Sequence, residues 1–217
     1  MKISIKTIAC AAIILSSISM TTHVSAQFSG GLRGGVNLAT LSGQEGSGLK
    51  NKPLVQPYIT AFGQYNISSA FAILLGAGYS GEGVKDNDVS SGDTYKAMFS
   101  YIRVPLLAQY KFSFGGYIEA GPEVGFLLSA KAKYNNAAST DVKQYIKKTD
   151  FGIQPGLGYE FSKGALSGFG LNAHFMFGLT NINRNTSGIL NSDESDNSDN
   201  TKNTDRAITF GITYRIL

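Results

Sequence analysis

The chain ends in the stretch AITFGITYRI (residues 207–216), in which apolar residues alternate with small or polar ones. Ile208, Phe210, Ile212, Tyr214 and Ile216 occupy every even position of this stretch. Successive side chains of a β-strand point to opposite sides of the sheet, so a period of two predicts a strand with one apolar face.

The same alternation recurs along the chain. Seven further runs carry it, over residues 28–41, 54–65, 71–81, 99–112, 116–129, 151–161 and 169–181. A strand that crosses a membrane needs about 9–11 residues, and these runs have that length or slightly more. Large residues such as Phe126, Phe175 and Phe210 share the apolar face, whereas the opposite face is polar and rich in glycine.

The connections between these runs alternate in length. Short ones fall near residues 66–70, 113–116 and 162–168, and long polar ones near 42–53, 82–98, 130–149 and 182–206. This alternation is typical of membrane barrels, which have short periplasmic turns and long external loops. In lipid every backbone polar group must be bonded internally, so the sheet must close on itself. The sequence therefore predicts an all-β fold, an eight-stranded antiparallel up-and-down transmembrane β-barrel.

The first 26 residues have the pattern of a secretory signal peptide. Two lysines precede a short apolar stretch, and Val24-Ser25-Ala26 supplies small residues before Gln27. We expect export, cleavage near Ala26, and a barrel domain over residues 27–217 in the bacterial outer membrane. The only cysteine, Cys10, lies in the segment that would be removed, so no disulfide is expected.

The composition excludes several other classes of protein. Of 217 residues, 26 are glycine, which costs roughly 1 kcal/mol inside a helix and argues against a helical protein. The hydrophobic content of 42% excludes intrinsic disorder. The net charge is only +4, and no basic cluster stands out, so nucleic acid is not an expected partner.

Four prolines fall inside the predicted strands, namely Pro57, Pro105, Pro122 and Pro155. Proline has no N–H to donate to the ladder and normally occupies edges or bulges, yet a closed barrel has no edge. We therefore expect bulges or locally broken pairing at these positions.

The predicted inner face carries charges of both signs. It collects the cations Arg33, Arg103, Lys111 and Arg215 and the anions Glu119, Glu123 and Glu160. Unpaired charges in a narrow lumen would be costly, so we interpret this set as an interior salt-bridge network. The alternative is the selectivity lining of a pore, although an eight-stranded barrel leaves an interior that side chains can fill.

Folding the 101–131 hairpin about its turn predicts two particular pairs in this network. Glu119 should lie near Lys111, and Glu123 near Arg103. On this assignment, Glu123→Ala would leave Arg103 unpaired.

No pattern of catalytic or metal-binding residues stands out. His174 lies on the predicted inner face without a visible nucleophile partner, which favours a packing role. The acidic tract over residues 191–200 lacks the spacing of an EF-type calcium loop. We therefore expect no enzymatic activity, no metal and no cofactor.

Several stretches resemble a known family. They are YIRVPLLAQYKF (101–112), YIEAGPEVG (117–125), DFG (150–152), GYEF (158–161) and FGLTNI (177–182). The chain is similar to the outer-membrane β-barrel domains called the porin family or PorT-like, small barrels built like OmpX and the transmembrane domain of OmpA. Barrels of this kind end in a strand that serves as an assembly signal, and Thr209, Gly211, Tyr214 and Ile216 match that pattern. The departure is Leu217, where such barrels usually end on phenylalanine.

The resemblance is specific for the fold and leaves two functions open. The first is a structural or interaction barrel with a plugged lumen that presents long external loops. The second is a small porin-like channel for ions or small solutes. The expected partners are outer-membrane lipid, the barrel-assembly machinery, and an external protein or surface ligand at loops 82–98, 130–149 and 182–206; a monomer is expected. PorT-like relatives also imply a role in protein secretion, which no residue here tests.

Overall fold

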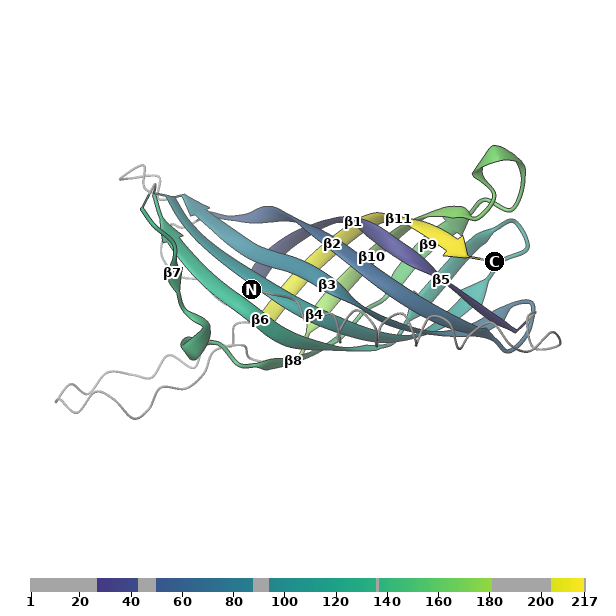
Figure 1. Ribbon diagram of the computed structural model, residues 1–217, viewed down its shortest axis with the longest axis horizontal. Coiled ribbons are helices and arrows are strands. Elements are labelled where there is room, and N and C mark those ends of the chain that lie inside the picture. Colours follow the sequence, from purple (N-terminus) through teal and green to yellow (C-terminus); the bar gives the residue numbers. More distant parts are fainter. Residues whose placement is uncertain (1–26, 43–49, 88–93, 136, 181–203, 217) are drawn as a thin grey trace, which may run out of the picture.

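The computed structural model describes residues 27–42, 50–87, 94–135, 137–180 and 204–216. Eleven strand segments form one antiparallel sheet (Figure 1). They are β1 (Phe28–Ser42), β2 (Lys50–Asn66), β3 (Phe71–Asn87), β4 (Thr94–Lys111), β5 (Gly116–Ala120), β6 (Pro122–Tyr134), β7 (Thr140–Asp141), β8 (Thr149–Ile153), β9 (Gly156–Glu160), β10 (Phe169–Gly178) and β11 (Thr204–Ile216). Two short 3₁₀ turns, η2 (Lys143–Tyr145) and η3 (Gly164–Leu166), lie between strands. Within these residues, no helix is long and apolar enough to cross a membrane.

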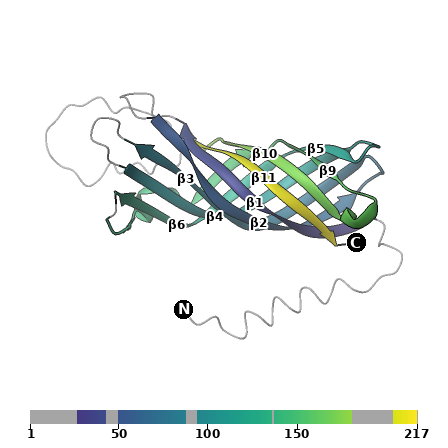
Figure 2. The ribbon, with the colours of Figure 1, turned by 90° about the horizontal axis from the view of Figure 1, so that it is seen from above.

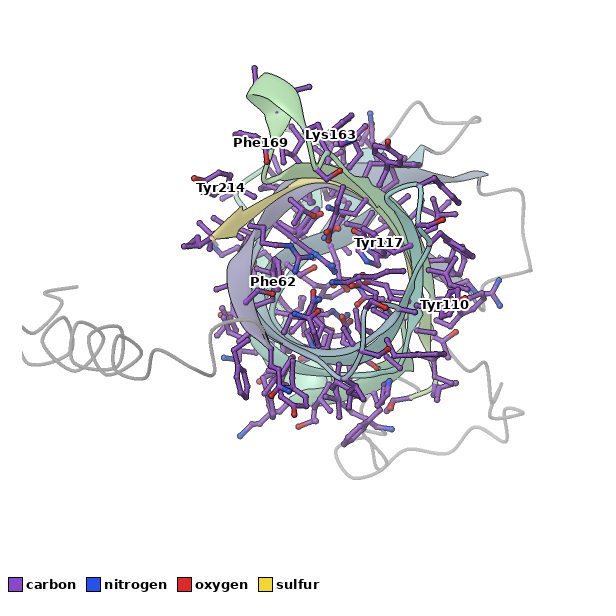
Figure 3. The ribbon with its side chains drawn as sticks, turned by 90° about the vertical axis from the view of Figure 1, so that its right-hand side faces the viewer. Phe62, Tyr110, Tyr117, Lys163, Phe169 and Tyr214 are labelled. Atoms are coloured by element: carbon purple, nitrogen blue, oxygen red, sulfur yellow. The ribbon has the colours of Figure 1, made fainter. Side chains whose placement is uncertain are left out.

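The sheet closes into a barrel of eight strands, as the sequence predicted, when interrupted strands are counted once. The segments β5 and β6 follow one another along β4, and the segments β8 and β9 both lie along β10. Each of these two pairs therefore forms one interrupted strand of the barrel. The last strand, β11, pairs with both β10 and β1, which closes the barrel. Figure 2 shows the tilted strands from above, and Figure 3 shows the closed ring end-on.

The two faces of the wall are those that the alternation predicted. Phe126 and Phe210 point outward with 48% and 50% of their surface exposed. Asn37, Asn172 and Thr213 point inward and are buried. In Figure 3, Phe62 and Tyr117 lie inside the ring, and Tyr110, Phe169 and Tyr214 lie outside it.

Each of the four prolines coincides with an irregularity in the ladder. Pro57 lies where the β2–β3 register shifts by one residue, and no pairing with β3 is made opposite Pro105. Pro122 directly follows the break between β5 and β6, and Pro155 lies in the break between β8 and β9. The two breaks face each other, and Gln154 N–H donates to Gly121 O across them at 2.9 Å. The expected bulges and interrupted pairs are therefore confirmed.

The barrel has two unlike ends. The short turns after β2, β4 and β9 lie together at the right of Figure 1, which we call the turn end. The opposite end, with β7 and η2, is called the outer end. Here the strands run further than predicted: β3, β4 and β6 continue through parts of the expected loops 82–98 and 130–149. Most of loop 182–206, including the tract over 191–200, lies outside the described residues.

Candidate functional site: the charged lumen

The lumen is filled by layers of side chains stacked along the barrel axis. At the turn end, Arg215 on β11 forms an ion pair with Glu160 on β9 and donates to Gln64 Oε1 at 3.0 Å. Lys111 at the end of β4 donates to Asn66 Oδ1 at 2.9 Å. Arg215, Glu160 and Lys111 are only partly buried, so this layer borders on solvent.

The next layer, the central cluster, is built around Glu119 on β5. Arg33 on β1 binds both oxygens of this carboxylate, at 2.6 and 3.1 Å. His174 Nε2 lies 2.5 Å from Oε1, and Gln109 Nε2 donates to Oε2 at 2.8 Å. The ring of Phe62 lies below the Arg33 guanidinium, 5.0 Å from its carbon. Arg33 and Glu119 are both nearly inaccessible, and the two-pronged geometry compensates for the desolvation of their charges.

The third layer, the outer cluster, places one guanidinium among three carboxylates. Arg103 Nε and a terminal nitrogen donate to the two oxygens of Glu82, each at 2.6 Å. The other terminal nitrogen donates to Asp150 Oδ2 at 2.9 Å and lies 3.4 Å from Glu123 Oε1. All four side chains are at most 6% exposed. Arg103 therefore holds together β3, β4, β6 and β8 through its charge.

Neutral polar side chains extend the outer cluster around the barrel. Ser80 donates to Glu82 Oε1 at 2.9 Å and accepts from Asn37 Nδ2 at 2.8 Å. Thr209 on the last strand donates to Asn37 Oδ1 at 2.9 Å. This chain of bonds links β11 and β1 to β3, so the network crosses the point where the barrel closes.

A cavity of about 40 Å³ separates the central cluster from the outer cluster. Its lining includes Arg33 and His174 on one side and Glu82, Arg103 and Glu123 on the other. A cavity needs a volume of at least about 10–15 Å³ to hold one water molecule, so this cavity has room for about three waters.

The outer end of the lumen is apolar. Inward residues of β3, β4 and β6 form a buried cluster with Ile146, which follows η2; its members are Val84, Ala97, Phe99, Tyr101, Leu127, Ala130 and Ile146. Tyr101 is fully buried, and its ring faces the Arg103 guanidinium at 4.6 Å. A layer without charge thus lies directly above the outer cluster.

Small residues leave room for these large inward side chains. A Cβ atom at Gly211 would overlap the hydroxyl of Tyr58, which donates to Asn172 Oδ1 at 2.9 Å. A Cβ atom at Gly158 would likewise overlap the hydroxyl of Tyr117. Gly211 belongs to the predicted assembly signal, so packing of the lumen accounts for that glycine without any contact to another protein.

The structure places all seven predicted lumen charges on the inner side of the wall, but not all in the predicted pairs. Glu119 binds Arg33 across the lumen, and the prediction that it pairs with Lys111 is wrong. The β4–β5 register sets Gln109 opposite Glu119 and Tyr117 opposite Lys111. Glu123 does lie near Arg103, though at 3.4 Å and as one of three acids.

Two members of the outer cluster, Glu82 and Asp150, were not among the residues predicted to line the lumen. Glu82 is the first residue of the predicted loop 82–98, and Asp150 lies between the predicted loop 130–149 and the predicted strand 151–161. Glu82 faces inward like Ser80, and Asp150 faces inward like Gly152, so extending the predicted strands 71–81 and 151–161 by one residue each would have included them.

The remaining predicted site residues lie on β11. Thr209 points into the lumen, whereas Tyr214 and Ile216 point outward with 47% and 59% of their surface exposed. Leu217 lies outside the described residues. Across the part of the chain that is described, no three His, Cys, Asp or Glu side chains are grouped so as to hold a metal ion.

Several solved structures match this chain over most of their length, at low identity. The attachment invasion locus protein Ail of Yersinia pestis, solved with the heparin analogue sucrose octasulfate, matches with 9% identity and a TM-score of 0.46; 88% of this chain and 99% of Ail are covered. Neisserial surface protein A matches with 10% identity and a TM-score of 0.42 over 86% of this chain and 96% of its own. The outer membrane protein OprG of Pseudomonas aeruginosa matches with 12% identity and a TM-score of 0.37 over 87% and 94%.

Comparisons of the sequence itself give one match. No curated protein matches the chain. The family model for the outer membrane protein beta-barrel domain matches residues 22–184, which is most of the chain. Together with the closed, outward-apolar barrel, this match shows that the chain belongs to the outer membrane protein beta-barrel domain family.

Proposed function

We propose that this protein is an outer-membrane barrel with a closed lumen, which anchors and presents its external end. The observation that carries the proposal is the filling of the lumen. Two buried ion clusters and an apolar layer succeed one another along the axis, and the cavity between the clusters measures only about 40 Å³. A hydrated ion or a small solute would have to displace charged side chains that are already bound to one another.

The remaining parts of the proposal follow from the sequence. Residues 1–26 act as a cleaved export signal, and residues 27–217 form the barrel domain. Tyr214 and Ile216, at the end of the closing strand, are offered to the barrel-assembly machinery during insertion. The external end, with loops 82–98, 130–149 and 182–206, is the part available to an external protein or surface ligand.

The alternative is a porin-like channel, and conductance decides between them. Purified protein is reconstituted into planar bilayers, with an established porin in the same lipid as the control for insertion. We expect no steady ohmic conductance, because an ion would have to displace charged side chains that are bound to one another. Ion flux into dye-loaded vesicles provides a second measurement in the same lipid.

One result would reverse the proposal. Steady channels in the wild-type protein, with an ion selectivity that changes in Glu123→Gln, would show that Glu123 faces moving ions. The network would then be a pore lining, and the protein a channel.

A further inference from the structure

Lysines face one another in register across the outer wall of the barrel. Lys85 on β3 is paired with Lys96 on β4, and Lys96 is paired with Lys133 on β6. On the other side, the backbone register sets Lys52 of β2 opposite Lys85. Four neighbouring strands thus carry lysine at one level, although the four positions are scattered over residues 52–133 of the sequence.

The row lies on the outer face of the wall. Val84 and Ala97 point inward and are buried, so Lys85 and Lys96, next to them in the chain, point outward. Ala130 is also buried, which sets Lys133 on the outer face of β6. We call Lys85, Lys96 and Lys133 the lysine row. No member of the row forms an ion pair with a carboxylate among the residues that the structure describes.

Such an arrangement is unfavourable without a counter-ion. Neighbouring strands lie about 4.8 Å apart, and like charges directly opposite each other destabilise a sheet. The positive charges of the row therefore favour the binding of an anion. Its members are spaced closely enough for one polyanionic group to contact two of them.

The height of the row on the barrel indicates which anion this is. Strands in such barrels are tilted by about 40° and rise about 3.3 Å per residue, so each residue advances about 2.5 Å along the axis. An apolar band about 25 Å tall then takes up about ten residues. On β4 this band runs outward from Tyr110, whose ring contacts those of Phe71 and Phe112 at the turn end, to the region of Ser100.

Lys96 lies four residues beyond Ser100, which is about 10 Å above the apolar band at the same rise. The headgroup layer adds roughly 5–7 Å to each side of the hydrocarbon core. A lysine has a flexible four-carbon stem, so its ammonium group reaches back into this layer. The row thus faces the phosphates of the surrounding lipid rather than the space above the loops.

We infer that the lysine row binds the phosphate groups of lipids in the external leaflet of the outer membrane. The contact is made on the outer wall of β3, β4 and β6, so it holds whether or not the lumen conducts. It fixes the height of the barrel on the side where its strands are longest.

The test measures the binding of lipid A with and without its phosphates. Mature protein in a nonionic detergent is titrated with bis-phosphorylated lipid A and with dephosphorylated lipid A, and bound lipid is counted by native mass spectrometry. The row variant is Lys85→Gln/Lys96→Gln/Lys133→Gln. The control variant, Lys163→Gln, removes the charge of an exposed lysine at the turn end, on the opposite side of the apolar band from the row.

We expect the wild type and the control variant to bind the phosphorylated lipid, and salt to weaken this binding. A basic residue near an anionic surface changes affinity about fivefold, so the row variant should bind about tenfold to one hundredfold more weakly. In detergent without lipid A, the row variant should unfold at the same temperature as the wild type or a higher one, because repulsion is removed.

Three results would overturn the inference. They are equal binding by the row and control variants, equal binding of lipid A without phosphates, and a loss confined to a soluble polyanion. The last is measured with a sulfated polysaccharide in the same detergent. If only its binding depends on the row, the row is a site for soluble polyanions and not for lipid.

Discussion

Arg103 is the side chain whose removal should damage this barrel most. Its guanidinium makes two contacts of 2.6 Å to Glu82 and one of 2.9 Å to Asp150, and it lies 3.4 Å from Glu123. Arg103→Met keeps a long apolar stem and removes the charge. The three carboxylates would then face one another in a layer with 6% exposure or less.

The size of the effect follows from these contacts. Breaking a buried ion pair by removing one partner costs about 3–5 kcal/mol, because the other charge stays buried and uncompensated. We expect Arg103→Met to lose at least that amount. Glu123→Gln should lose less than about 1 kcal/mol, because its contact is longer than a hydrogen bond and Arg103 keeps two carboxylates. Arg103→Lys should fall between the two, since an ammonium group cannot bind both Glu82 oxygens side by side.

Urea unfolding in lipid vesicles gives the free energy of each variant. The chain has no tryptophan, so the transition is followed by the different gel mobilities of folded and unfolded protein and by far-ultraviolet circular dichroism. If Arg103→Met is as stable as Glu123→Gln, the outer cluster is hydrated and its charges do not hold the barrel together.

Three other outcomes are expected. Phe210→Arg on the lipid-facing wall should lower the free energy of unfolding by about 2–4 kcal/mol, whereas Phe114→Arg, in a turn outside the apolar band, should lower it by less than about 1 kcal/mol. Equal losses of the two variants in urea titrations would refute the assignment of Phe210 to the lipid-facing side. Gly211→Ala should cost about 1–3 kcal/mol because the new Cβ overlaps the Tyr58 hydroxyl, and Tyr58→Phe should restore part of the folded fraction; no recovery would refute that cause. N-terminal sequencing of outer-membrane fractions should begin at Gln27, and an intact N-terminus there would contradict cleavage near Ala26.

Much of the wall could be predicted from the sequence, because the alternation of residue types along a β-strand indicates which side of the sheet each side chain faces. The alternation in residues 207–216 gave the right parity for Phe210 and Thr213, and the same rule held on the other strands. Alternation says less about where a strand ends. Beyond the lipid, outward positions become polar, and a strand that continues into water looks like a loop.

The charge pairs show the limit of local reasoning. The Arg33–Glu119 pair joins residues 86 positions apart across the lumen, and no hairpin register contains it. Pairing between neighbouring strands of a hairpin pointed to Lys111 instead. Glu123 was likewise expected to be the partner of Arg103, whereas Arg103 makes its shorter contacts with Glu82 and Asp150. The lysine row was invisible for the same reason, since its members are neighbours only in the folded sheet.

The inward charges also bear on how the chain finds its correct pairing during insertion. A strand that slips by one residue turns every side chain to the opposite face. If β1 slipped in this way, Arg33 would face lipid, at a cost of about 2–4 kcal/mol near the midplane, and Glu119 would lose its partner. Relative to well-packed apolar side chains, buried ion pairs add little stability to the correct arrangement. They do penalise the nearest incorrect registers, so the ion clusters select the correct strand register. A lumen with only apolar or glycine residues would fill the same space without that discrimination.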